Sequence, residues 1–182
     1  MTDIIRKQMY YVGFRQALSP VVDITRDPRW GRITETYGED AALTSAMASA
    51  FVKGIQGDEL KEGVLATAKH FAGHGITEGG LNMGRNIVSE RDMREIHCKP
   101  FQCAITEAGL KSVMNSYCSV NGEPVVGSKK MLTDILRGEM GFQGFVVSDY
   151  LSLDRLVDPF AVAENFEEAG IRAIQAGLDL SL

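Results

Sequence analysis

Asp149 is the residue whose place in the sequence most strongly indicates chemistry. It follows Phe145–Val147, an apolar run of aromatic and β-branched residues that Gly141 and Gly144 precede. Such a run is typical of a buried parallel strand. A carboxylate at the C-terminal end of that kind of strand lies where barrel enzymes carry their catalytic groups. Aspartate also caps helices and closes turns, so this stretch alone leaves the catalytic and the structural interpretation open.

Four other chemically capable residues follow strand-like segments. Arg32 lies in the loop after the first such segment, Lys69 and His70 end the second, and Tyr117 ends the third. If the strands are parallel neighbours, these side chains and Asp149 converge on one polar, donor-rich cup. A cup of this kind suits a ligand covered in hydroxyl groups better than an apolar ligand.

Other ligands fit the pattern less well. Arginine and lysine also bind phosphate, but the sequence has no GxxxxGK[ST] loop and no GxGxxG after a strand. Its three histidines lack the spacing of a metal site. We therefore expect no metal and no cofactor.

Structural roles compete with these functional ones. Lys69 and His70 could form a buried pair that supports the following loop, and the charges between residues 23 and 40 are expected to form mostly salt-bridged scaffolding. Trp30 is either a sugar-stacking platform or, more in keeping with its flanking arginines, a residue that packs the loop. His97, inside an amphipathic segment, suits packing or the surface better than ligand binding.

The elements that must position these residues alternate between strand and helix. Strands are predicted at 17–24, 64–69, 111–117, 144–147 and 178–182, and helices at 40–55, 89–107, 129–139 and 162–176, with a break at Pro100. This alternation predicts a parallel sheet with right-handed crossovers, in a barrel or a doubly wound arrangement. The longest loops follow strands, which favours a barrel.

The number of units limits the barrel. About four to five βα units are present, whereas a complete eight-fold barrel needs ~250 residues. We therefore predict an α/β fold, a partial (β/α)8 TIM-type barrel whose opening strands are missing, with residues 1–182 as a single partial domain.

Composition narrows the partners. The chain is 45% hydrophobic and 24% charged, with a net charge of −5, which argues against nucleic acid. No apolar run approaches the ~18 residues of a membrane span, and the first residues lack the apolar core of a signal peptide. Cys98, Cys103 and Cys118 show no zinc-like or CxxC spacing and are expected to be core thiols. Neither the first residues of the chain nor its cysteine spacing decides the cellular location.

Several stretches resemble glycoside hydrolase family 3. SPVVDITRDPRWGRITETYGED resembles its signature loop, ATAKHFAGHG its KHF motif and GFVVSDY its nucleophile strand, and the similarity runs from about Gln16 to the end. The resemblance implies a retaining, exo-acting β-glycosidase with Asp149 as catalytic nucleophile. It also implies that Arg32, Lys69 and His70 bind sugar hydroxyls.

The resemblance further implies a supporting role for Tyr117, which would orient the carboxylate or stabilise the charged intermediate. Positive charge on Lys69 and Arg32 would favour the ionised form of Asp149. Leu81 stands where many relatives place a sugar-binding arginine, for which Arg85 could substitute. The GGLN stretch around Leu81 is similar to the branch that hydrolyses terminal β-D-glucosyl or β-D-xylosyl residues.

Two alternatives remain beside this prediction. One is a β-N-acetylhexosaminidase of the same family, although Thr77 and Glu78 occupy the neighbourhood of that branch's DSH-like loop. The other is a non-catalytic carbohydrate-binding barrel. The expected substrate is a β-linked oligosaccharide or aryl glycoside, and a homo-oligomer is left open.

The resemblance also implies that the chain lacks a domain that family members of the glucosidase type have. Family members of the glucosidase type take their acid/base glutamate from a second, α/β-sandwich domain, which we do not find in this sequence. We therefore expect the chain to be an incomplete fragment that needs the missing strands and the second domain of a parent chain, with doubtful activity on its own.

Overall fold

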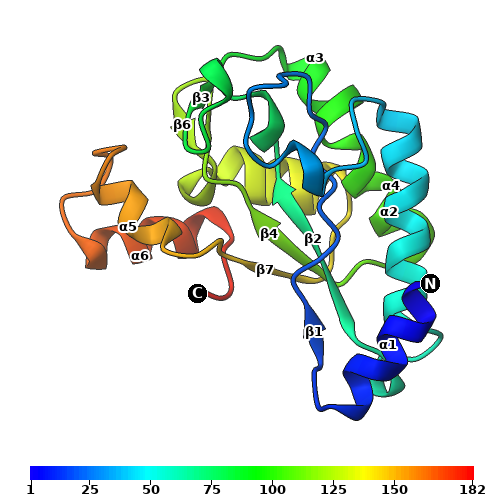
Figure 1. Cartoon of the computed structure of the whole chain (residues 1–182). Coiled ribbons are helices and arrows are strands. Elements are labelled where there is room, and N and C mark those ends of the chain that lie inside the picture. The colour runs from blue at the N-terminus through cyan, green and yellow to red at the C-terminus, as the bar shows by residue number, and fades with distance from the viewer.

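The computed structural model describes all 182 residues and is built on one parallel sheet (Figure 1). Its four strands are β1 (Gln16–Ala17), β2 (Leu65–Phe71), β4 (Ser112–Asn115) and β7 (Phe145–Val147), in the order β1-β2-β4-β7. Every neighbouring pair is parallel. The predicted α/β class with a parallel sheet is confirmed, and the sheet is open because β1 and β7 form its two edges.

Helices connect the strands. They are α1 (Thr2–Tyr11), α2 (Ala41–Gln56), α3 (Glu90–Asp92), the π-helical η5 (Met93–His97), α4 (Lys99–Ala108), the π-helical η7 (Lys130–Glu139), α5 (Ser152–Val157) and α6 (Phe166–Ala176). In Figure 1, α2 and α4 lie together on one side of the sheet, and α5 and α6 extend beyond β7 on the other.

Short elements lie in the loops. They are the single turns η1 (Ile33–Glu35), η2 (Leu60–Glu62), η3 (His74–Ile76), η4 (Glu78–Gly80) and η6 (Val125–Gly127), and a second sheet of β3 (Arg85–Asn86), β5 (Ser119–Val120) and β6 (Glu123–Pro124). The sequence did not predict this second sheet, because two-residue strands carry no periodic signal.

The helix boundaries follow from capping chemistry. Asp40 accepts the N–H of Leu43 at 2.6 Å, and α2 ends at Gly57, whose φ of 65° suits glycine. Ser89 accepts the N–H of Asp92 at 3.0 Å, and the helix it opens is broken before α4, which has Pro100 in its first turn. These predictions are confirmed. Ser128 likewise accepts the N–H of Met131 at 3.2 Å at the start of η7.

Three predicted boundaries are wrong. The strand at 17–24 is regular only at Gln16–Ala17 and continues as irregular pairing, in which the N–H of Val22 donates to the carbonyl of Lys69 at 2.7 Å. Pro20 has no N–H to donate, which explains the interruption. The helix predicted from 162 begins at Phe166, because Asn165 caps it by accepting the N–H of Glu168 at 3.0 Å. The strand at 178–182 is reduced to one bridge between Leu180 and Val147.

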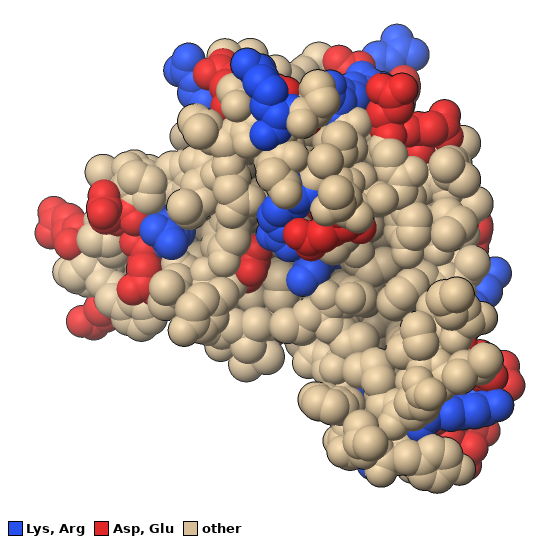
Figure 2. All heavy atoms as spheres, in the orientation of Figure 1, with Lys and Arg blue, Asp and Glu red and all other residues tan.

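A single core of 33 buried residues lies between the sheet and the helices. Phe71 at the end of β2 packs edge-on against Phe101 of α4, with ring centroids 5.1 Å apart. The three cysteines are buried and free. No helix has both the length and the apolar character that crossing a membrane requires. On the face in Figure 2, basic and acidic side chains lie beside each other rather than in a field of one sign.

Candidate active site

The candidate site lies where β2, β4 and β7 end. Lys69 and His70 lie near the C-terminal end of β2, Asn115 ends β4, and Ser148 and Asp149 follow β7. Parallel pairing of Val113 with Ala68 and Val146 aligns the three strands, so their C-terminal ends meet at one edge of the sheet. This is the edge where barrel enzymes carry their chemistry.

Asp149 has one tethered and one free carboxylate oxygen. Its Oδ1 accepts the N–H of Tyr150 at 2.8 Å, and its own N–H donates to Asn115 Oδ1 at 3.3 Å. Its Oδ2 is buried, forms no hydrogen bond and lies 3.5 Å from His70 Nε2. The side chain is 14% exposed. One oxygen is therefore held by the backbone, while the other has no hydrogen-bond partner.

His70 is held from behind by Asp23. Asp23 Oδ2 lies 2.8 Å from His70 Nδ1 and accepts the backbone N–H of His70 at 3.2 Å. Both side chains are only 1% exposed. Burial by itself raises the pKa of Asp23, but the charge and hydrogen bonds of His70 outweigh it and lower the pKa below its ordinary value.

Asp23 is the site residue that the sequence reasoning missed, since it was assigned to salt-bridged scaffolding. A signal was present in the sequence. Asp23 directly follows the apolar pair Val21–Val22, and a carboxylate in such a run is buried and needs a specific partner.

The two predicted cations lie near Asp149 without bonding to it. Arg32 donates to both carboxylate oxygens of Glu35, at 2.7 and 2.8 Å. That pairing, with smaller contributions from the charges of Asp149 and Asp23, raises the pKa of Arg32. Lys69 is half-buried and makes no ion pair, and burial followed by the charge of Arg32 lowers its pKa, which the charge of Asp149 partly opposes.

Tyr117 contacts the backbone next to Asp149. Its hydroxyl donates to the carbonyl of Tyr150 at 2.6 Å. Burial, followed by the charge of Asp149, raises the pKa of Tyr117 to about 12, so the phenol keeps its proton at neutral pH. The structure thus places Tyr117 beside the carboxylate, where it ties the loop after β4 to the loop after β7.

His74 packs beside His70, and Trp30 packs against His74. Trp30 is 1% exposed and meets the ring of His74 edge-on, with centroids 5.1 Å apart, so it packs the loop. His74 is fully buried and lies 4.7 Å from the ring of His70. Burial lowers the pKa of His74 to about 4, so this ring is neutral at pH 7.

Six of the fourteen buried side-chain nitrogen and oxygen atoms that have no hydrogen-bond partner lie here. They are Asp23 Oδ1, Trp30 Nε1, His70 Nε2, both ring nitrogens of His74, and Asp149 Oδ2. Buried polar groups are normally hydrogen-bonded, so such a group of atoms marks a place where solvent or a ligand completes the structure. No three His, Cys, Asp or Glu side chains lie in an arrangement that could hold a metal ion.

The loop above the site carries Leu81 and Arg85. Leu81 is 64% exposed. Arg85 donates to Glu78 Oε2 at 2.7 Å, and its side chain is 68% exposed. In this structure the guanidinium of Arg85 is therefore engaged by a neighbour in its own loop.

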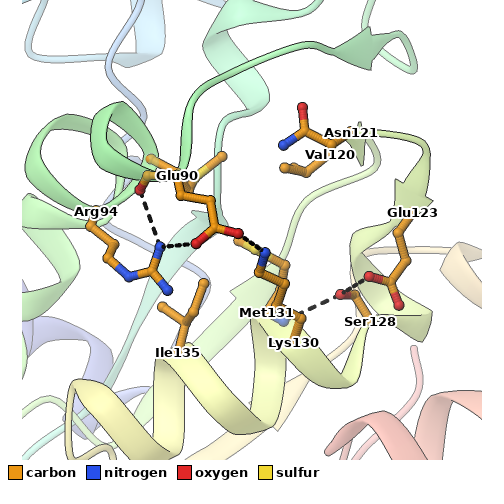
Figure 3. A pocket seen from close by; sticks show the side chains of 10 residues that line it. Glu90, Arg94, Val120, Asn121, Glu123, Ser128, Lys130, Met131 and Ile135 are labelled. Atoms are coloured by element: carbon orange, nitrogen blue, oxygen red, sulfur yellow. Dashed lines mark hydrogen bonds and ion pairs between the residues drawn. The ribbon is translucent and has the colours of Figure 1, made fainter.

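A separate cavity of about 160 Å³, the Glu90 pocket, lies between η7 and the second sheet. Figure 3 shows Glu90 between Arg94 and Lys130, and Ser128 donating to Glu123 at 2.8 Å. Apolar side chains of Met93, Val120, Met131 and Ile135 also line it. None of the residues that we predicted for the site belongs to this pocket.

Comparison with known proteins identifies the family. The family described as glycosyl hydrolase family 3 N terminal domain matches residues 1–182. The chain belongs to this family. The N-terminal domain of family 3 is a TIM-type barrel, so the open parallel sheet is part of such a barrel, as predicted.

Family 3 relatives extend well beyond the length of this chain. A beta-xylosidase of Formosa agariphila is 43% identical over 94% of this chain and 24% of its own length. A periplasmic beta-glucosidase of Salmonella typhimurium is 36% identical over 93% and 22%. A mutant beta-glucosidase from Listeria innocua, solved in complex with laminaribiose, superposes with a TM-score of 0.94 at 34% identity, covering 99% of this chain and 25% of that one. The chain thus spans about a quarter of these relatives.

Proposed function

We propose that this chain carries the nucleophile and sugar-binding side of a retaining β-glycosidase that acts on terminal β-D-glucosyl or β-D-xylosyl residues. The observation that carries the proposal is the free Oδ2 of Asp149, which lies at the C-terminal edge of a parallel sheet near Lys69 and Arg32. Family 3 membership and the names of the relatives, beta-xylosidase and beta-glucosidase, support it.

The chemistry follows from that oxygen. Asp149 Oδ2 attacks the anomeric carbon, the glycosidic C–O bond breaks, and the leaving oxygen takes a proton from a general acid. A water molecule then hydrolyses the glycosyl-aspartate ester. The residue that served as general acid now acts as a base and removes a proton from that water molecule. The charges of Lys69 and Arg32 stabilise the ionised nucleophile, and these residues and His70 bind sugar hydroxyls.

The general acid is the part that this site does not supply. A retaining mechanism needs a second carboxyl group roughly 5–5.5 Å from the first. Asp23 is unsuited to that role, because it is buried behind His70 and already accepts two N–H groups through one oxygen. We propose that the acid/base comes from outside these 182 residues, which form one partial domain of a larger enzyme. Without it, the reaction rate falls by a factor of ~10²–10⁴.

The test compares 4-nitrophenyl β-D-glucoside, β-D-xyloside and N-acetyl-β-D-glucosaminide, whose good leaving group needs little help from an acid. Hydrolysis of the first two, lost in Asp149→Gly and restored by azide as external nucleophile, supports the proposal. The matched control is Asp154→Gly in α5, a carboxylate outside the site. Preference for the N-acetylglucosaminide, or unchanged hydrolysis in Asp149→Gly, contradicts it.

A further inference from the structure

We infer that Asp23 is a positioning residue for His70: it holds the ring so that Nδ1 donates to Asp23 and Nε2 faces Asp149. Its consequence for hydrolysis rests on the function proposed above. The inference joins three buried groups in line: the Asp23 carboxylate, the His70 ring and the Asp149 carboxylate.

The proton on Nδ1 follows from the chemistry of the contact. An ionised carboxylate has only acceptor atoms, and an imidazole nitrogen either donates or accepts. Asp23 Oδ2 lies 2.8 Å from His70 Nδ1, which is hydrogen-bond distance, so Nδ1 must be the donor. The same oxygen accepts the backbone N–H of His70 at 3.2 Å, so Asp23 holds both the ring and the chain that carries it.

The other edge of the ring faces the nucleophile. Its Nε2 lies 3.5 Å from Asp149 Oδ2, beyond the usual 2.7–3.2 Å of an N–H···O hydrogen bond. Neither atom has another partner. Asp23 therefore determines which ring nitrogen is turned toward Asp149.

The neighbouring rings keep this orientation. His74 packs against His70 with centroids 4.7 Å apart and planes inclined by 53°, and Trp30 supports His74 from its edge. A flip of the His70 ring would exchange each nitrogen with a ring carbon and bring a carbon to Asp23. Packing and hydrogen bonding therefore select the same arrangement.

A purely structural role does not account for the burial of the Asp23 carboxylate. The side chain is 1% exposed, and its only side-chain hydrogen bond is to His70. Removing a carboxylate from water is unfavourable, and apolar groups of similar size often replace buried ion pairs without loss of stability. What an apolar residue could not supply is control over which nitrogen of His70 carries the proton.

The functional consequence concerns the nucleophile. With Nδ1 donating to Asp23, the ring makes no hydrogen bond to Asp149 Oδ2. If Asp23 is replaced by asparagine, the side-chain amide can donate to Nδ1, which then carries no proton, and the ring proton is on Nε2. That N–H would then donate to Asp149 Oδ2 and reduce its nucleophilicity. The analogous change in the serine protease triad, which also produces the wrong tautomer, lowers kcat by about 10⁴.

The test reads the tautomer directly, by ¹⁵N NMR of the chain with labelled histidine. In the unsubstituted chain at pH 7, we expect the His70 signals to show a protonated Nδ1. Asp23→Asn should remove the proton from Nδ1, whereas Asp27→Asn, a matched loss of charge in the same loop, should not. An unprotonated Nδ1 in the unsubstituted chain overturns the inference, and this measurement needs no variant to fold.

A kinetic measurement separates this inference from the proposed function. With 4-nitrophenyl β-D-glucoside, Asp23→Asn should lower kcat by at least ~10²-fold with a smaller change in KM, and Asp27→Asn should change neither appreciably. A kcat for Asp23→Asn equal to that of the control overturns the inference while the proposed function stands. The expected tautomer in a chain whose Asp149 takes no part in hydrolysis overturns the proposed function while the positioning role stands.

Discussion

The candidate site and the Glu90 pocket both combine carboxylates with cations, yet they use them in opposite ways. In the Glu90 pocket, Glu90 bonds Arg94 at 3.2 Å and also pairs with Lys130, and Arg94 pairs with Glu139 at 2.7 Å. These side chains are between 34% and 60% exposed. Every charge named here is neutralised by a neighbour and by solvent.

At the candidate site, the charges are arranged but not all neutralised by direct contact. Lys69 makes no ion pair, and Asp149 Oδ2 has no hydrogen bond. Their burial makes an unpaired polar atom unfavourable, whereas exposed pairs contribute little either way. The comparison teaches that a cavity and charged side chains do not by themselves distinguish a ligand site from scaffolding. At the candidate site buried polar atoms lack partners, whereas at the Glu90 pocket the charges are paired and exposed.

The largest expected effect is on hydrolysis of an aryl glucoside by Asp149→Asn against Glu90→Gln. Loss of the nucleophile should lower kcat on the order of 10⁴-fold, by analogy with loss of other covalent catalysts, because no neighbouring carboxylate can take its place. Glu90→Gln should leave kcat within about twofold. A comparable loss in both variants would show that the two regions do not differ as described.

The next largest effect separates two adjacent residues of β2. Phe71 is fully buried against Phe101, so Phe71→Ala should lower the free energy of unfolding by roughly 3–5 kcal/mol. His70→Gln should change stability less than Phe71→Ala and ligand binding more. Urea denaturation and sugar titration of both variants measure this, and the reverse ranking would contradict the division between core and site at the end of β2.

Two buried histidines predict a pH dependence of stability. The pKa values of His74 and His97 are both lowered to about 4, chiefly by burial. An unfolded histidine has a pKa near 6.5, so between pH 6.5 and 4 the unfolded chain binds more protons. Stability should therefore be fully present above pH 6.5 and fall as the pH drops toward 4, by roughly 2–3 kcal/mol for each ring.

Urea denaturation at pH 7 and pH 4.5 measures this loss. His97→Gln, outside the site, should remove about half of it, and the remainder belongs to His74. Stability that is flat over this range, or that rises as the pH falls, would mean that neither ring is held neutral by burial.

The smallest effect is expected at the exposed ion pairs of the Glu90 pocket. Glu90→Gln breaks two exposed ion pairs, which solvent screens, so its effect on the free energy of unfolding should be the smallest of those predicted here. Thermal unfolding at low and high salt checks it, since salt should reduce the difference between the variant and the unsubstituted chain. A loss of stability as large as that of Phe71→Ala would show that the ion pairs of Glu90 contribute more to stability than their exposure explains.

Elements with a clear local signal could be predicted from the sequence. The helix from Ala41 has an aspartate cap and a glycine end, and the strand at Phe145–Val147 is a short apolar run preceded by two glycines, so local chemistry specifies both. The helices α1 and α5 and the small second sheet were not predicted. Helix α1 has no fully buried residue and no capping side chain, and α5 likewise follows the site loop without a capping side chain.

The candidate site could be predicted in part. Reading strand ends identified Asp149, Lys69, His70 and Tyr117, because parallel strands bring their C-terminal ends together. Asp23 could not be separated from the charged loop that follows it, since its role depends on His70, which is 47 residues away in the chain. Pairing across such a distance is a property of the folded sheet, which spacing along the chain does not show.

The central claim is that Asp149 Oδ2 is the atom that bonds to the sugar, and covalent trapping tests it most directly. A 2-deoxy-2-fluoro-β-D-glucosyl fluoride carries a leaving group that needs no general acid, and its intermediate is hydrolysed slowly. Mass spectrometry after incubation should find the added sugar on the peptide that contains Asp149, and no addition in Asp149→Asn. Addition at another residue, or equal addition in Asp149→Asn, would contradict the account.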